Sequence, residues 1–259
     1  MPKSASFDII GTCFTFDHPI QAIHSRLAPI LTTTSTDAKT LFFAWFYAAQ
    51  RDFTYLSLTG SYVPIAQILR ATFKRACLVV DIPAHAVSDE DVDAVMRAFG
   101  ALRPREGLKD CFDGLRGEGW LVLGVTNGAV GSSLGYFREA GVVLGEGDLV
   151  SCDVVGFAKP DGRVYGCALE RLGRVEMESG SGKGDGEEDG KEGDGDGDGK
   201  GERWFVAAHA WDLVAARKAG FKTAYLDFEE HDPVTEVFGE FDLYAASMEE
   251  LLRKLREVG

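Results

Sequence analysis

The stretch SFDIIGTCFTF, residues 6–16, places one acid and a glycine–threonine step inside an otherwise apolar run. A carboxylate buried in such a run costs folding energy unless it is paired or hydrogen-bonded. Asp8 lies where the first apolar run is expected to form a buried strand. We therefore expect Asp8 to have a functional role, and we look to the rest of the chain for the groups that meet it.

The overall composition is that of an ordinary globular protein. The chain has 259 residues, of which 45% are hydrophobic, enough for one large α/β domain or a core with a smaller companion. Its five cysteines show no C-x-x-C spacing, which favours reduced thiols over a disulfide framework or a zinc site. We find no leader segment and no apolar stretch near the roughly 18 residues of a membrane span. We therefore expect a soluble, cytoplasmic protein.

The formal net charge of −14 argues against nucleic-acid and anionic-membrane partners, although half of it is local. Residues 178–202, ESGSGKGDGEEDGKEGDGDGDGKGE, hold ten acids and three lysines and no apolar side chain. Such a segment cannot offset its ordering entropy, so we expect a disordered surface insertion. Its DGDGDGK, residues 194–200, resembles the start of a calcium loop. Phe205 stands where the last ligand, a glutamate, belongs, so we do not expect calcium binding.

Outside the insertion, strand-like and helical patterns alternate along the chain. With short links between them, this alternation predicts a parallel sheet covered by helices on both faces. Residues 20–100 break the rhythm and read as helices throughout, which indicates a helical module inserted after the first strand. The expected strands are 7–10, 120–125, 149–155, 204–208 and 223–226, and the expected helices are 132–141, 161–173, 210–220 and 247–258. Gly173 and Gly220 are the expected stops of two of these helices.

Polar residues follow the ends of four expected strands. In an open parallel sheet, ligands bind at the carboxyl ends of the strands, so these residues should converge on one mouth. Together they supply two carboxylates, a lysine and several hydrogen-bonding groups. They are Asp8 with Gly11 and Thr12, then Thr126, Asn127 and Gly128, then Lys159 and Pro160, and finally His209 and Asp212.

This ordered set resembles the motifs of the haloacid dehalogenase superfamily. The matching segments are DIIGTCF at 8–14, VTNG at 125–128, AKPDGRVY at 158–165 and VAAHAWDLVAARKAG at 206–220. The L-2-haloacid dehalogenase subgroup is the one most resembled. The resemblance implies an α/β fold with a Rossmann-like core from residues 1–16 and 105–259, and a helical cap from residues 17–104.

The resemblance also implies roles for individual residues. Asp8 would be a nucleophile that forms an aspartyl ester, which water then hydrolyses. Lys159 would keep Asp8 ionised, and Asp212 would position the hydrolytic water or Lys159. Further residues would orient the substrate or line its pocket, and His209 could hydrogen-bond a carboxylate or the water. These candidate binding residues are Thr12, Phe46, Tyr47, Thr126, Asn127, Tyr165, His209 and Trp211.

Two departures from the superfamily pattern bear on the reaction. Phosphatases of the superfamily carry an acid two residues after the nucleophile and another four residues before the final aspartate. This chain has Ile10 and Ala208 there. Without the general acid, efficient phosphate-ester cleavage is not expected. We expect no cofactor, and Mg²⁺, held by Asp8 and Asp212, only if the protein acts as a phosphatase.

In the subgroup, an arginine early in the cap accepts the leaving halide. Phe46 or Tyr47 stands at that position here. We expect hydrolytic dehalogenation of small 2-haloacids, and the alternatives are a hydrolase for a more apolar substrate, a weak phosphatase or a catalytically silent binding protein. The intact set Asp8, Lys159 and Asp212 argues against the silent protein. We expect a small-molecule substrate and leave a homodimer open.

Overall fold

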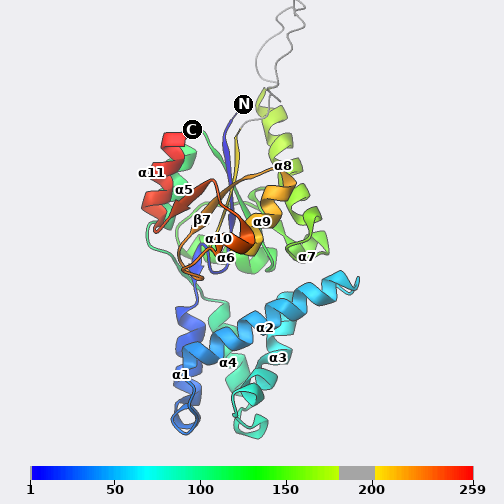
Figure 1. Cartoon of the computed structure of the whole chain (residues 1–259), viewed down its shortest axis with the longest axis vertical. Helices are drawn as coiled ribbons and strands as arrows, with labels where there is room; N and C mark the ends of the chain where they lie inside the picture. The colour runs from blue at the N-terminus through cyan, green and yellow to red at the C-terminus, as the bar shows by residue number, and fades with distance from the viewer. Residues whose placement is uncertain (1, 181–201, 259) are drawn as a thin grey trace, which may run out of the picture.

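The larger part of the molecule is a parallel sheet between two layers of helices (Figure 1). The computed structural model describes residues 2–180 and 202–258. Its six-stranded sheet has the order β5-β4-β1-β6-β7-β8, with every neighbouring pair parallel. The predicted α/β class is therefore confirmed. The strands are β1 Ser4–Asp8, β4 Leu121–Thr126, β5 Leu149–Ser151, β6 Arg203–Ala207, β7 Lys222–Leu226 and β8 Leu243–Ala245.

The sheet places β1 at its centre, between β4 and β6. All five residues of β1 are buried, because helices cover a parallel sheet on both faces. The helices that form these layers bury apolar residues at helical spacing. In Figure 1, α5 and α11 lie on one side of the strands and α8 and α9 on the other. The helices are α5 Leu108–Gly117, α6 Val130–Glu139, α8 Gly162–Gly180, α9 Ala210–Ala219 and α11 Met248–Val258.

The smaller part is a group of four helices beyond the sheet, at the lower end of Figure 1. Two of them begin at polar caps: Asp37 accepts hydrogen bonds from two backbone N–H groups of α2, and Ser88 forms a capping box with Asp91 at the start of α4. Aromatic rings fill the space between the helices, with Phe42 and Phe46 stacked on each other. The helices are α1 Asp17–Leu31, α2 Ala38–Leu58, α3 Ile65–Val79 and α4 Asp89–Phe99.

A short antiparallel ribbon joins the two parts. It consists of β2 Phe14–Thr15 and β3 Arg103–Pro104, so the chain leaves the sheet after β1 and returns before α5. We propose that the chain passes from one part to the other after residue 16 and again after residue 104. These two positions would then be the domain boundaries. None of the helices in the described ranges is long and apolar enough to cross a membrane. The remaining short elements are η1 Ala84–Ala86, η2 Glu146–Asp148, α7 Cys152–Val155 and α10 Thr235–Phe238.

Three expectations from the sequence need correction. The run 149–155 is not one strand: β5 ends at Ser151, whose hydroxyl accepts the N–H of Asp153 and starts α7. Helix α8 does not stop at Gly173 but continues to Gly180, so residues 178–180 of the expected insertion are helical. The rest of that segment up to 201, including the calcium-like stretch, lies outside the described residues. The first strand is Ser4–Asp8, which makes Asp8 its last residue.

A glycine in the central sheet provides a test of this packing. A Cβ on Gly124 of β4 would lie 2.8 Å from Leu149 Cδ1 and 2.9 Å from Ile9 Cδ1. Overpacking of this kind typically costs about 1–3 kcal/mol, and we expect Gly124→Ala to lose that much free energy of unfolding in urea titrations. The control is Gly166→Ala in α8, where an added Cβ meets nothing within 4 Å. Equal stability of the two variants would contradict the packing described.

Candidate active site

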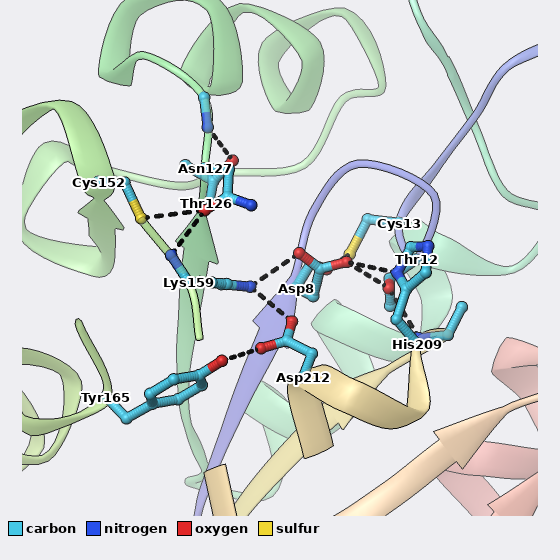
Figure 2. Close-up of polar contacts among 12 residues, drawn as sticks. Asp8, Thr12, Cys13, Thr126, Asn127, Cys152, Lys159, Tyr165, His209 and Asp212 are labelled. Carbon is cyan, nitrogen blue, oxygen red and sulfur yellow. Dashed lines mark hydrogen bonds and ion pairs between the residues drawn. The ribbon is translucent and has the colours of Figure 1, made fainter. Parts of the chain in front are cut away.

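Three charged side chains meet at the carboxyl ends of the central strands. Asp8 ends β1, Lys159 lies between α7 and α8, and Asp212 is in the first turn of α9. The Lys159 Nζ donates to Asp8 Oδ1 at 2.8 Å and to Asp212 Oδ2 at 2.7 Å, as Figure 2 shows. All three residues are buried. The buried ammonium is therefore paired on both sides by carboxylates.

The remaining carboxylate oxygens also accept hydrogen bonds. Thr12 Oγ1 donates to Asp8 Oδ2 at 2.6 Å and accepts the backbone N–H of Ala208 at 2.9 Å. The hydroxyl of Tyr165 donates to Asp212 Oδ1. Each oxygen of the two carboxylates thus has a donor, as buried ionised groups require. Thr12 and Tyr165 hold the two carboxylates by these hydrogen bonds. Neither residue lines the cavity described below.

The electrostatic balance favours an ionised Asp8. Burial acts to raise the pKa of Asp8, but the charge of Lys159, together with His209, outweighs it and holds this pKa below its ordinary value. Burial acts to lower the pKa of Lys159, but Asp212 and Asp8 raise it. Burial, with the nearby charge of Asp8, leaves the pKa of Asp212 raised. Asp8 is therefore a carboxylate that stays charged and available to attack.

Thr126 and Asn127, at the end of β4, form hydrogen bonds, and that of Asn127 fixes the loop carrying Lys159. Thr126 Oγ1 accepts the N–H of Gly128 at 3.0 Å. Asn127 Oδ1 accepts the backbone N–H of Lys159 at 3.1 Å and the thiol of Cys152 at 3.2 Å. Asn127 thus fixes the backbone from which the Lys159 ammonium extends.

Helix α2 holds the same loop from the side of the helical part. Ser57 Oγ accepts the N–H of Ala158 at 2.9 Å, and Thr54 Oγ1 donates to the carbonyl of Lys159 at 3.2 Å. Tyr62, just after α2, donates to Asp153 Oδ1 at 2.6 Å. The position of Lys159 therefore depends on both parts of the molecule.

Asp8 faces a cavity of about 40 Å³ between the sheet and the helical part. Six of the residues predicted from the sequence lie in its wall. These are Asp8, Phe46, Thr126, Asn127, His209 and Trp211. Tyr47, the alternative to Phe46, lies outside the cavity and is 41% exposed.

Five further residues line the cavity that the sequence did not identify as wall residues, although Ile10 was noted as the residue in place of a general acid. Four of the five are apolar side chains, which carry no chemical signature of a binding role. Gln50 follows Phe46 by four positions on α2, and this helical spacing could have identified it. The five residues are Ile10, Gln50, Ile65, Leu69 and Phe99. The wall is therefore mostly apolar, with its polar groups near Asp8.

A wider groove, of about 860 Å³, lies beside this cavity. Gln50 and Trp211 line both, so the groove and the cavity share a wall. Its other residues include Tyr47 and the acids Glu229 and Glu230. The groove is therefore a second, larger space that adjoins the cavity at Gln50 and Trp211.

His209 is 2% exposed and stands beside the nucleophile candidate. Its Nδ1 lies 3.8 Å from Asp8 Oδ2, and its Nε2 has no hydrogen-bond partner among the described residues. Gly11, with φ of +90°, gives it room, because a Cβ there would lie 3.0 Å from the imidazole Cε1. Burial acts to lower the pKa of His209, but the nearby Asp8 charge leaves it raised above the ordinary value.

The same geometry tests whether Asp8 and Asp212 suit Mg²⁺. The ammonium of Lys159 already binds one oxygen of each carboxylate, and Thr12 and Tyr165 bind the others. A divalent cation prefers several free oxygen ligands. Within the described ranges we find no cluster of three or more residues suited to a metal. The residues present do not fit a metal between these two carboxylates.

Comparison with known proteins gives a consistent likeness over most of the chain. Over 228 residues the chain is 26% identical to the (S)-2-haloacid dehalogenase of Pseudomonas sp. (strain YL), spanning 87% of this chain and 82% of that protein. A solved L-2-haloacid dehalogenase has a TM-score of 0.76 at 18% identity, over 98% of this chain and 99% of that one. The Xanthobacter autotrophicus enzyme with chloropropionic acid covalently bound has a TM-score of 0.67 at 15% identity, over 100% of both chains. No family model matches the chain.

The Thr12 hydroxyl allows a direct test of the site's hydrogen bonding. Thr12→Val keeps the shape but removes the donor to Asp8 and leaves the N–H of Ala208 without its acceptor. Leaving buried groups unpaired costs about 1–3 kcal/mol, and we expect that loss in urea unfolding at pH 7. Thr12→Ser retains the hydroxyl and is the control. If the valine variant is as stable as the serine variant, the hydroxyl does not make these bonds.

Proposed function

We propose that this chain, a haloacid dehalogenase-like protein similar to the L-2-haloacid dehalogenases, is a hydrolase that uses Asp8 to remove halide from small 2-haloacids. The observation that carries the proposal is the buried, ionised Asp8, which is held by Lys159 and Thr12 and faces a small enclosed cavity. A carboxylate held in this way is a suitable nucleophile for a covalent ester mechanism.

In the first step, a carboxylate oxygen of Asp8 attacks C2 of the haloacid from the side opposite the halogen. The new C–O bond forms as the carbon–halogen bond breaks, and the bonding electron pair leaves with the halide, so C2 inverts. Lys159 and Thr12 fix the carboxylate for this attack. Halide leaves unprotonated, so no general acid is needed, and Ile10 in the cavity wall fits this chemistry.

In the second step, water attacks the carbonyl carbon of the aspartyl ester. The bond from that carbon to the oxygen now joined to C2 breaks, and this oxygen, which came from Asp8, takes up one proton of the water and leaves in the 2-hydroxy acid. The water oxygen stays on Asp8, and the second proton is released. The sum is haloacid plus water to hydroxy acid, halide and a proton. Asp212, fully buried and bonded to Lys159 and Tyr165, keeps the ammonium beside Asp8. We therefore assign Asp212 to positioning Lys159, one of the two roles that the sequence suggested.

The helical residues 17–104 act in this proposal as a cap. Phe46, Gln50 and Leu69 belong to this part and line the cavity in front of Asp8. An enclosed, apolar wall excludes bulk water from the first step and strengthens the electrostatic interactions inside. The four apolar residues that the cap contributes also favour the second candidate, a hydrolase for a neutral, more apolar substrate. They are Phe46, Ile65, Leu69 and Phe99.

The cysteines and the contacts of Lys159 also bear on the location of the protein and on its need for a cofactor. All five cysteines are free, which supports our proposal of a reducing, cytoplasmic location. The chemistry above requires no cofactor. Phosphatase activity is disfavoured because Ile10 replaces the general acid and Lys159 binds both carboxylates. A homodimer stays a prediction from the sequence.

Isotope labelling tests the nucleophile. A single turnover of 2-chloropropionate in H₂¹⁸O should place ¹⁸O in the Asp8 peptide and not in the first lactate formed. Asp8→Asn should lower halide release by roughly 10³-fold or more without unfolding the protein, because the amide is nearly isosteric but cannot attack.

The control for this experiment is Asp110→Asn, which changes an exposed acid on α5. Label that enters lactate in the first turnover would contradict the ester mechanism, because it would mean that water attacks C2 directly. Full activity of Asp8→Asn would rule out this residue as the nucleophile.

A further inference from the structure

The proposed substrate brings a charge problem into the site. A 2-haloacid is a carboxylate anion at neutral pH. The groups already there are the carboxylates of Asp8 and Asp212 and the ammonium of Lys159, a set with one excess negative charge. Bringing a further anion beside this set, where water is scarce, is unfavourable unless another cation is present.

The cations near the site are already engaged. The Nζ of Lys159 bonds to both carboxylates, and its side chain does not line the cavity. Arg51 bonds to Asp52 with a side chain that is 56% exposed. Arg105 bonds to Glu229 and to the carbonyl of Gly11. Among the residues of the cavity wall, His209 alone can take up a positive charge.

The surroundings of His209 favour the protonated ring. Four acids face it: Asp8 at the end of β1, Asp212 on α9, and Glu229 and Glu230 in the segment after β7. Burial acts against the charged imidazole, yet these acids raise its pKa above the ordinary value. Glu230 is itself bonded to the N–H of Ala210, and Glu229 to Arg105. A protonated ring would also present an N–H at Nε2, which has no acceptor among the described residues.

We infer that His209, as the imidazolium, is the group that admits and holds the substrate's carboxylate, and so sets the specificity for anionic substrates. This inference rests on the proposed function, because the anion is the haloacid. With the ring charged, the set formed by Asp8, Asp212, Lys159 and His209 has no net charge before the substrate enters. With the ring neutral, the substrate meets a site with net negative charge.

The inference predicts a definite dependence on pH. As the pH rises through the pKa of His209, the charge is lost and the affinity for an anionic substrate falls. Asp8 does not contribute to this change, because its pKa lies below the ordinary value and it stays ionised throughout. A neutral analogue such as 2-chloropropionamide gains nothing from the imidazolium and should show no such dependence.

Binding of propionate, an unreactive analogue, tests the inference without any turnover. The wild-type protein is titrated from pH 5.5 to 8.5 by NMR of the histidine Cε1 protons, with and without propionate. Among the five histidines, the His209 signal is the one missing from His209→Asn. We expect propionate to raise the pKa of His209 and to bind more weakly as pH rises. Propionate affinity that is constant over this range, or a His209 signal that propionate does not shift, would overturn the inference.

Kinetics provide the second arm. We expect His209→Asn and His209→Gln to lower kcat/KM for 2-chloropropionate by about 10- to 100-fold, mainly through KM, and to flatten its pH profile. Turnover of 2-chloropropionamide should change less than about threefold. The control is His231→Asn, since His231 is exposed and also lies beside an acid, Asp227, at 3.3 Å.

The outcomes separate this inference from the proposed function. Equal loss of activity on the acid and the amide would assign His209 to the chemical step and overturn the inference. So would wild-type activity on the acid that increases as His209 deprotonates, because that is the behaviour of a general base. If the wild type releases no halide from either compound, the proposed function fails. The propionate titration on the wild type still decides the inference, also where a variant does not fold.

Discussion

A buried ammonium between two buried carboxylates is the constraint on which the site depends. Lys159 joins the end of β1 to the start of α9 through Asp8 and Asp212. Removing the ammonium would leave two carboxylates without a counter-charge in a site with little water, which is strongly destabilising. Further bonds from Thr12 and Tyr165 are needed for the same reason. Lys159 and Thr12 thus have two effects on Asp8: they keep its carboxylate ionised and in position, and they offset the free-energy cost of burying it.

This constraint also links the helical part to the chemistry. Ser57 and Thr54 of α2 bond to the backbone at Ala158 and Lys159. The helices that close over the cavity therefore also help to place the ammonium. A change in how the cap sits on the sheet would alter both the shape of the cavity and the position of the Lys159 charge.

The site combines an apolar wall with few charged groups, so each charge has a large effect on the electrostatic energy of a bound substrate. In a wall of this kind the protonation of one imidazole changes the net charge that a substrate meets. His209 has this position because Gly11 leaves space for its ring and Asp8 lies beside it. Reactivity and the choice of substrate are thus assigned to different residues on neighbouring strand ends.

The amino-acid sequence alone predicted the α/β class and the convergence of Asp8, Lys159 and Asp212, because parallel strands bring their carboxyl ends to one edge. It predicted Phe46 at the pocket, but not the end of β5, the length of α8, or that Gln50 lines the cavity and Tyr47 does not. Those features depend on the rotation of helices and on contacts between residues far apart in the chain. The raised pKa of His209 belongs with them, because it depends on burial, which acts to lower it, and on four acids that come together only in the folded protein.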